Sequence, residues 1–535
     1  MKKIVFVLTA LSIAAALNAC GYASADSSAL SPNSATASAS VDENAVPEFD
    51  IKGELVKSQS HGIKIDNYGS VFASKPEENA NPLIANIFCA DPTAVEYDGR
   101  LYVYGTNDQQ QYEAVGSDGS NTYEKIKSIV MLSTDDMVNW TYHGIIDIEK
   151  ISPWAIASWA PSVTSRVEED GKTHFYLYYS NSGCGVGVIT AENPLGPWTD
   201  PLGEPLVSTS TKGLKGCPNP FDPGVCIDEN GTGWLTFGGG KAPGGSEYMP
   251  GSTRIVQLGE DMISFASEFA EIPAPYFFEA SELNYINGTY VYTYNNSWDK
   301  RLQWEYKDFS RPAACSMAYM TTKTPLDTDS WKYSGDYFKN PGEQGLDYSN
   351  NHTHLQKYSD KYYLFYHALF PQKALGTEGG FRSLCVNEII INEETVEILK
   401  GSGTKKGVEQ IKNVDPYKVN QAETFFTASD ILYSDSEENG NMFIGGNSGS
   451  WTYVRGVDFS EKTSSFAARV NGKGRIEVYA DSIDGEYLAA VEFDCDEFKN
   501  VYSNDIKQVE GVHDLYFVIS GSGMLFDEWQ FLSRK

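Results

Sequence analysis

The stretch that decides the fold runs Tyr276-Phe277-Phe278-Glu279-Ala280-Ser281-Glu282-Leu283-Asn284-Tyr285-Ile286-Asn287-Gly288-Thr289-Tyr290-Val291-Tyr292-Thr293-Tyr294. Two runs rich in aromatic residues flank an Asn-Gly turn, and the second run alternates aromatic with smaller side chains. This pattern predicts a β-hairpin. Glu279 stands early in the first strand, among large apolar neighbours, where a surface carboxylate is not expected.

The hairpin recurs along the chain. Between residues 76 and 405, short aromatic strands alternate with Gly, Asn, Asp and Pro turns, and no long segment has helical periodicity. The turns are about 60 to 70 residues apart, which suits a four-stranded blade with its loops, so five units predict an all-β, five-bladed β-propeller. The five turns lie at Asp98-Gly99, Asp170-Gly171, Asn230-Gly231, Asn287-Gly288 and Ser359-Asp360.

Residues at a matched distance before each turn are candidates for a common site. The first strand of each propeller blade lines the central channel, so residues of equal rank on these strands converge near the axis. Three of the five are acids, and chance placement of three acids at matched ranks in apolar strands is the weaker explanation. The five residues are Asp91, Ser162, Asp222, Glu279 and His352.

Composition limits the class of partner. With 72 acidic and 41 basic residues, the formal charge is −31, which repels phosphate backbones and argues against a nucleic-acid partner. The 33 Tyr, 26 Phe and 10 Trp suit many short strands and surfaces that stack on sugar rings.

The N-terminus predicts export. Residues 1–20 contain two lysines, an apolar run and Leu17-Asn18-Ala19-Cys20, which resembles a bacterial lipoprotein signal with a lipidated Cys20. The alternative is an ordinary signal cleaved after Ala25, with Cys20 discarded. We therefore expect a cell-surface or periplasmic lipoprotein that contacts the membrane only through its lipid anchor, or a secreted protein if Cys20 is not lipidated.

The remaining boundaries follow from composition. Residues 21–75 form a polar tether and lead-in, and residues 406–418 form a linker. Residues 419–535 contain short strands, and the length of this segment suits a jelly-roll-like β-sandwich. The seven cysteines after Cys20 are scattered in apolar contexts without a disulfide or zinc pattern, which favours buried free thiols.

The convergent acids suit glycoside hydrolysis with inversion. That reaction needs a protonated carboxylic acid at the leaving oxygen and a carboxylate that activates water on the opposite face of the sugar. Glu279, between apolar neighbours and near Asp222, is the candidate acid because both influences raise its pKa. Asp91 is the candidate base. In Asp91-Pro92 and Asp222-Pro223 the proline holds the preceding Asp extended, although a single Asp-Pro pair is also a common turn.

Residues 81–400 resemble glycoside hydrolase family 43. The resemblance implies a five-bladed propeller, an inverting mechanism on arabinofuranosides or xylosides, and no cofactor for catalysis. It implies Asp91 as base, Asp222 as the carboxylate that orients the acid and raises its pKa, and Glu279 as acid. The motifs are Cys89-Ala90-Asp91-Pro92, Trp159-Ala160-Pro161-Ser162-Val163, Phe221-Asp222-Pro223-Gly224-Val225, Phe278-Glu279-Ala280-Ser281, Asn350-Asn351-His352 and Phe381-Arg382-Ser383.

Other residues have competing interpretations. Glu282 competes for the acid role, but three positions from Glu279 it has opposite strand parity and should face away from the channel. The resemblance implies that Arg382 contacts the sugar, the alternative being an ion pair between blades. Trp159 and Phe278 are further candidate substrate contacts, although a propeller aromatic is usually core. By the same resemblance His352 helps to hold a hydrated calcium ion in the channel; a hydrogen-bonded core histidine is the alternative.

The C-terminal domain resembles carbohydrate-binding module family 6. The similarity is carried by Gln421-Ala422-Glu423, by Gly449 to Phe459, by Gly511 to Tyr516 and by Phe526 to Phe531. It implies that Glu423 and Asp527 bind a structural calcium ion. Where the family has a tryptophan-rich ligand loop, this chain has Asp496 to Tyr502, so support of the propeller is an alternative to sugar binding.

The sequence therefore predicts an exported, inverting glycosidase that removes α-L-arabinofuranosyl groups from arabinoxylan or a related plant cell-wall polysaccharide or oligosaccharide. A β-xylosidase or a mixed activity is the second prediction. Two other classes stay open: a non-catalytic surface glycan-binding protein, and a retaining five-bladed fructan hydrolase with an Asp nucleophile.

Overall fold

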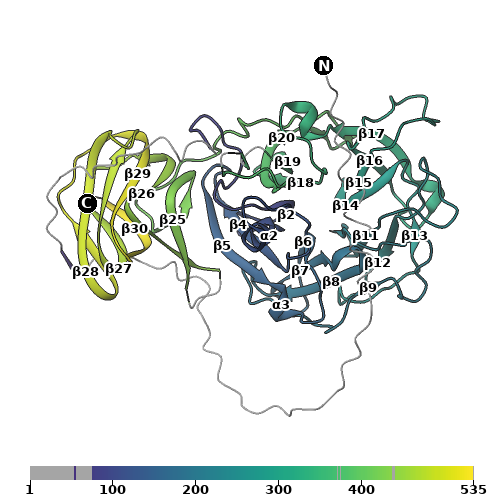
Figure 1. The fold of residues 1–535 in the computed structure, drawn as a ribbon, viewed down its shortest axis with the longest axis horizontal. Helices are drawn as coiled ribbons and strands as arrows, with labels where there is room; N and C mark the ends of the chain where they lie inside the picture. The colour runs from purple at the N-terminus through teal and green to yellow at the C-terminus, as the bar shows by residue number, and fades with distance from the viewer. Residues whose placement is uncertain (1–53, 56–74, 370–371, 374, 437–439, 534–535) are drawn as a thin grey trace, which may run out of the picture.

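A computed structural model describes residues 54–55, 75–369, 372–373, 375–436 and 440–533. It confirms an all-β protein with a five-bladed β-propeller and a C-terminal β-sandwich (Figure 1). The lipoprotein signal and Cys20 lie outside the described residues. In the described ranges no helix has the length and apolar character needed to cross a membrane.

The five blades follow one another around the propeller, each with its first strand innermost. Blade 1 contains β2 (Ala90–Tyr97), β3 (Arg100–Thr106), β4 (Ser128–Thr134) and β5 (Trp140–Asp147), with the short helices α2 (Asp108–Val115) and α3 (Ile148–Ile151). Blade 2 contains β6 (Trp159–Val167), β7 (Thr173–Ser180), β8 (Gly185–Ala191) and β9 (Val207–Ser208). Blade 3 contains β10 (Gly224–Ile227), β11 (Gly233–Phe237), β12 (Arg254–Gln257) and β13 (Ala270–Glu271). Blade 4 contains β14 (Phe277–Ile286), β15 (Thr289–Asn296), β16 (Met317–Thr322) and β17 (Lys332–Phe338). Blade 5 contains β18 (Thr353–Tyr358), β19 (Lys361–Ala368) and β20 (Ser383–Ile389), followed by the pair β21 (Ile391–Asn392) and β22 (Glu397–Ile398).

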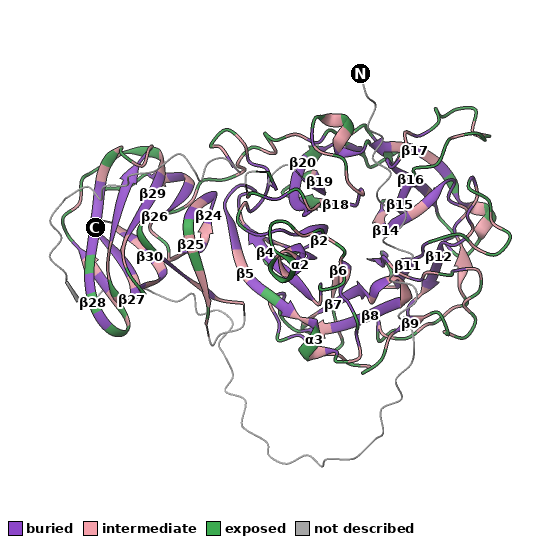
Figure 2. Ribbon diagram, viewed as in Figure 1, coloured by how far each residue is buried: buried purple, intermediate pink, exposed green. Residues whose placement is uncertain are grey.

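The β14–β15 hairpin forms as the sequence predicts. Ile286 pairs with Thr289, and the turn residues Asn287 and Gly288 have φ values of 45° and 74°. Two positive φ values define the type I′ turn, whose twist matches that of the flanking strands and which favours Asn-Gly. All eight residues of β15 are buried, which explains why both faces of this strand are aromatic or uncharged (Figure 2).

The ring closes through the segment that precedes β2. Blade 5 has three strands, and the N–H of Leu83 donates to the carbonyl of Leu384 in β20. The side chain of Asn81 is fully buried, donates to the carbonyl of Val386 and accepts from its N–H. These contacts satisfy backbone groups at the edge of β20 and join the first blade to the last.

The sandwich is built from long strands that bend and pair with several neighbours. Phe466, Phe517, Phe526 and Trp529 are buried at its centre. The hydrogen-bonded order is β1-β28-β27-β29-β26-β30-β23, with β25 beside β26. The bounds are β1 (Glu54–Leu55), β23 (Asn420–Gln421), β25 (Thr427–Asp435), β26 (Met442–Phe459), β27 (Thr463–Ala480), β28 (Glu486–Ser503), β29 (Gly511–Gly521) and β30 (Leu525–Ser533).

The sandwich docks on the outer edge of blade 1. Strand β24 (Thr424–Phe425) pairs with β5 and extends that blade to five strands. The buried side chain of Asn139 donates to the carbonyl of Arg455 and accepts from its N–H, both at 2.9 Å. The connecting segment 406–418 also contacts both domains, since the N–H of Ile411 donates to Asp136 and that of Val414 donates to Gly456. This connection is therefore packed against both domains.

The expectation of buried free thiols is confirmed for most cysteines of the described residues. Six are buried free thiols: Cys89, Cys217, Cys226, Cys315, Cys385 and Cys495.

Candidate active site

The first strand of a blade carries a repeated irregularity. In blades 1, 2 and 4 the pairing of the first two strands shifts register between Ala90 and Thr93, between Trp159 and Ser162, and between Glu279 and Glu282. Four blades have a residue with positive φ at the equivalent place: Asp91 at 50°, Ala160 at 38°, Asp222 at 50° and Ala280 at 59°. The positive φ of these non-glycine residues is energetically disfavoured, and such strain collects at functional sites.

This repeated position shows that the sequence prediction misplaced two residues, Glu279 and Ser162, relative to their counterparts in the other blades. Asp91 and Asp222 occupy the same position of their blades, but in blade 4 that position is Ala280, and Glu279 is one residue earlier. In blade 2 it is Ala160, and Ser162 lies two residues later. Counting back eight or nine positions misplaces Glu279 because the two counts differ by one residue. It misplaces Ser162 because a five-residue loop joins Val167 to Thr173, whereas two residues join Ile286 to Thr289. Glu279 is therefore equivalent to Trp159.

Hydrogen bonds across neighbouring blades hold the three carboxylates in place. The N–H of Asp222 donates to Oγ of Ser180 at 2.8 Å, and the N–H of Ala280 donates to Oδ2 of Asp222 at 2.8 Å. The N–H of Asp91 donates to Nδ1 of His367 at 3.2 Å. Asp91 and Asp222 are each 5% exposed and Glu279 is 8% exposed, so all three lie nearly out of solvent at one end of the inner strands.

Asp91 is surrounded by positive and donor groups. Its Oδ1 accepts from Nη1 of Arg382 at 2.8 Å, and its Oδ2 accepts from the hydroxyl of Thr106 at 2.8 Å. Burial alone would raise the pKa of Asp91, but the Arg382 guanidinium, followed by His367, holds it well below its usual range. Asp91 is therefore ionised and suited to the role of a base.

Arg382 lies in a buried ion-pair network that the sequence did not reveal. Nε and Nη2 of Arg382 donate to the two carboxylate oxygens of Asp108 at 2.9 and 2.8 Å, while Nη1 reaches Asp91. Asp108 begins α2 and is fully buried. The ion-pair interpretation of Arg382 thus describes its contacts in this structure. Asp108 belongs to none of the sequence motifs, and it lies 274 residues before Arg382 in the chain.

Asp222 and Glu279 are in less favourable surroundings for a charge. Burial raises the pKa of Asp222, and the carboxylate of Asp91 raises it further. Burial also raises the pKa of Glu279, followed by the carboxylates of Asp222 and Asp91. Asp222 receives hydrogen bonds from Ala280 and from the Ser180 hydroxyl, which favour its ionised form. The site therefore combines one ionised carboxylate with one that favours the protonated form.

The prediction that Glu282 faces away from the channel is wrong. The register shift between Glu279 and Glu282 cancels the simple alternation of a strand. Glu282 is 1% exposed, and its Oε1 lies 3.1 Å from Nδ1 of His354 on the inner strand of blade 5. Glu282 is thus paired with His354 in the interior, while Glu279 is the residue next to Asp222.

The remaining predicted contacts lie around the carboxylates. Trp159 is half-buried, and its Nε1 donates to the carbonyl of Tyr123 at 3.1 Å. Phe278 is half-buried beside Glu279. His352 is buried with Nδ1 3.7 Å from Oδ1 of Asp91. Tyr123, His367 and Asp108 are site neighbours that no sequence motif indicated.

The residues predicted to bind calcium differ in their surroundings. Burial lowers the pKa of His352 to about 4, so the imidazole is neutral, the form that binds metals. In the sandwich, burial raises the pKa of Glu423 well above its usual range, and the nearby Asp527 raises it further. Asp527 is buried and pairs with Arg469. A cation held by the two carboxylates would relieve their repulsion, so these residues fit a calcium site.

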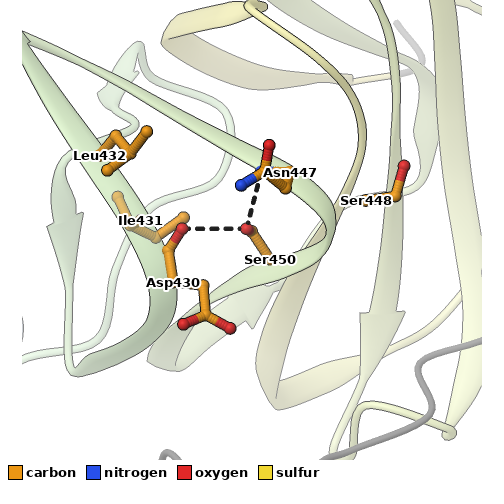
Figure 3. A pocket seen from close by; sticks show the side chains of 6 residues that line it. All are labelled: Asp430, Ile431, Leu432, Asn447, Ser448 and Ser450. Carbon is orange, nitrogen blue, oxygen red and sulfur yellow. Dashed lines mark hydrogen bonds between the residues drawn. The ribbon is translucent and has the colours of Figure 1, made fainter.

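The sandwich also has a pocket of about 410 Å³ (Figure 3). The hydroxyl of Ser450 donates to the carbonyl of Asp430, and the N–H of Asn447 donates to that hydroxyl, both at 3.0 Å. The lining has no aromatic side chain for stacking on a sugar. It consists of Asp430, Ile431, Leu432, Asn447, Ser448 and Ser450. The segment that replaces the family's ligand loop, Asp496 to Tyr502, lies within strand β28. Lys499 to Tyr502 pair with β27, whereas Asp496 to Phe498 fall in a register shift.

Comparisons with known proteins match both domains. Residues 79–396 match the model of glycosyl hydrolases family 43, and residues 421–533 match carbohydrate binding module family 6. An arabinoxylan arabinofuranohydrolase of Bacillus subtilis (strain 168) is 36% identical over 85% of this chain and 93% of its own length. One from Paenibacillus polymyxa is 34% identical over 85% of this chain and 74% of its own. A crystal structure of a family 43 arabinoxylan arabinofuranohydrolase from Bacillus subtilis, in complex with cellotetraose, has a TM-score of 0.79 at 34% identity and covers 87% of this chain and 99% of its own.

Proposed function

The chain belongs to glycosyl hydrolases family 43, and from that premise we propose that it removes α-L-arabinofuranosyl groups from arabinoxylan with inversion at the anomeric carbon. That it is a glycosidase follows from the family. The narrower choice of the arabinofuranosyl group is supported by the two relatives with that activity in their names, which align with 85% of this chain. A β-xylosidase or mixed activity is the second candidate.

The observation that carries the proposal is the difference in charge between two nearly buried carboxyl groups. Glu279 favours the protonated form, and Asp91 is held ionised by Arg382. In an inverting hydrolysis this difference assigns the two roles. Glu279 donates its proton to the glycosidic oxygen as the bond from that oxygen to the anomeric carbon breaks. Asp91 accepts a proton from the water that attacks the opposite face.

Asp222 supports the acid through its own charge and through the backbone. Its carboxylate raises the pKa of Glu279, and it accepts the N–H of Ala280, the residue that follows Glu279. After one turnover Glu279 is ionised and Asp91 is protonated, so a proton must return from Asp91 to Glu279 through solvent. No covalent intermediate is required.

The substrate assignment is tested with purified protein on an aryl α-L-arabinofuranoside, an aryl β-D-xyloside and intact arabinoxylan. We expect arabinose release from the first and third, and loss of that activity in Glu279→Gln and Asp91→Asn. Greater activity on the xyloside would favour the second candidate. An inactive wild type that still binds arabinoxylan would instead support a non-catalytic glycan-binding protein.

We propose in addition that the protein is exported and anchored through Cys20, on the basis of the lipoprotein-like signal in residues 1–20. Labelling cells with a palmitate analogue tests the anchor. Wild-type protein should take up the label and sediment with membranes, whereas Cys20→Ser should take up none. An unlabelled wild type in the culture medium would contradict the anchor and support secretion.

A further inference from the structure

Tyr123 lies in the segment between α2 and β4, and its backbone is held in a conformation that a bulky side chain rarely adopts. Its φ is 65°. Its N–H donates to Oδ1 of Asn121 at 3.3 Å, and Nδ2 of Asn121 donates to Oδ2 of Asp108 at 2.7 Å. The same Asp108 carboxylate anchors Arg382. Such strain persists only where surrounding contacts impose it, and it collects at functional sites.

The ring of Tyr123 contacts two residues of the candidate site. The Arg382 guanidinium carbon lies 4.9 Å from the ring centroid. The ring of Trp159 meets it edge-on, with centroids 6.1 Å apart and planes at 63°. Because Trp159 is equivalent in its blade to Glu279, Tyr123 is placed where the first and second blades border the carboxylates.

The hydroxyl of Tyr123 has no hydrogen-bond partner within the described ranges. The side chain is only half-buried, so this hydroxyl can meet a ligand. Burial raises the pKa of Tyr123 to about 12. The Arg382 guanidinium opposes this rise, and the carboxylates of Asp108, Asp91 and Glu279 add to it. The phenol is therefore neutral at ordinary pH and can both donate and accept a hydrogen bond.

We propose that Tyr123 is a substrate-contacting residue whose hydroxyl forms a hydrogen bond with a hydroxyl group of the pentofuranosyl ring to be cleaved. In this arrangement Trp159 and Tyr123 form one wall of the sugar site, and Arg382 lies behind Tyr123 while it holds Asp91. The inference rests on the proposed function and adds a residue that fixes the position of the glycosyl group. It predicts that the contact is made to the sugar that is released and not to the xylan backbone.

The variant Tyr123→Phe tests this because it removes one oxygen and keeps the ring. We expect kcat/KM to fall about ten-fold on both the aryl arabinofuranoside and arabinoxylan, the usual effect of losing one neutral hydrogen bond. The melting temperature should not change. Tyr97→Phe is the matched control, because Tyr97 stands at the opposite end of β2 from Asp91 and packs on Phe175. A loss confined to arabinoxylan, or no loss on either substrate, would overturn the proposal.

Substrates that each lack one ring hydroxyl separate a direct contact from a change in folding. With one of these deoxy arabinofuranosides, wild type should lose activity and Tyr123→Phe should lose no more, since the partner is already gone. Additive losses with every deoxy substrate would contradict a direct hydrogen bond.

Failure of the proposed function is recognised separately. If wild type cleaves only the aryl xyloside, the arabinofuranosidase assignment fails, and the same variants with deoxy xylosides still test Tyr123. If wild type cleaves neither glycoside, the role of Tyr123 is tested by sugar binding. NMR then compares the binding of L-arabinose and D-xylose to wild type and to Tyr123→Phe. Equal binding by both proteins would refute the role of Tyr123.

Discussion

The N–H of Ala280 donates a 2.8 Å hydrogen bond to Oδ2 of Asp222, and this bond joins the inner strands of blades 3 and 4 directly beside Glu279. In blades 1 and 2 the equivalent backbone N–H groups, those of Asp91 and Ala160, donate to the side chains of His367 and Thr106. In blade 3 the corresponding residue is Gly238, directly after β11, which has no side chain to accept. Asp222, two residues before β10, accepts instead. Asp222 is thereby the acceptor for the backbone N–H beside Glu279, and after burial its carboxylate contributes most to the raised pKa of Glu279.

Asp222→Asn should change the pH profile as well as the rate. An amide oxygen can still accept from Ala280, but the negative charge that raises the pKa of Glu279 is lost. The acid must be protonated, so activity falls as pH rises through its pKa. A lower pKa therefore moves this basic limb to lower pH, and kcat should fall about 10²-fold. Profiles of kcat/KM for wild type and variant measure the shift, and an unchanged basic limb would contradict the role given to Asp222.

Arg382→Met should be strongly destabilising. It leaves the buried carboxylates of Asp91 and Asp108 without their cation, and breaking a buried ion pair costs about 3 to 5 kcal/mol of unfolding free energy. Urea unfolding measures this cost. The double variant Arg382→Met with Asp108→Asn should be less destabilised than the sum of the single variants, because one of the unpaired charges is removed. Additive free energies would show that the two residues are not coupled.

Asn139→Ala should weaken the attachment of the sandwich to blade 1. Two hydrogen bonds to the Arg455 backbone are lost in a buried place, and we expect about 2 kcal/mol of destabilisation. Differential scanning calorimetry should show a lower melting temperature. Asn504→Ala, at an exposed position, is the control and should change the unfolding free energy by less than about 0.5 kcal/mol. If the melting temperature of Asn139→Ala equals that of wild type, these hydrogen bonds do not stabilise the contact between the sandwich and blade 1.

Removal of calcium should lower the thermal stability of the sandwich. If Glu423 and Asp527 bind the ion, calcium at about 100 times its dissociation constant adds about 2.7 kcal/mol to the free energy of unfolding. Melting curves with a chelator and with calcium restored measure this effect. Glu423→Gln should abolish the response to calcium. A wild type whose melting temperature is the same in both conditions would contradict calcium binding at this pair.

Local patterns in the sequence were sufficient for the fold. Asn287-Gly288 predicts a type I′ hairpin because few other residue pairs tolerate two positive φ values. Its recurrence predicts five blades, and the blades bring Asp91, Asp222 and Glu279 to one end of the inner strands. These steps depend only on neighbours in sequence and on the symmetry of a propeller.

Contacts between distant residues could not be predicted in this way. The register shift before Glu282 reverses its expected direction, and nothing local indicates where an inner strand gains extra residues. The pairing of Asp108 with Arg382 joins a short helix of blade 1 to blade 5, and Tyr123 reaches the site from an irregular segment. Each of these depends on tertiary packing and not on periodicity.

The central claim is that Glu279 and Asp91 act as acid and base in a single displacement. Proton NMR during hydrolysis of an aryl α-L-arabinofuranoside identifies the anomer that forms before mutarotation. We predict that β-L-arabinofuranose appears first and that Glu279→Gln and Asp91→Asn produce almost none. First appearance of the α anomer would mean net retention, and would contradict the mechanism.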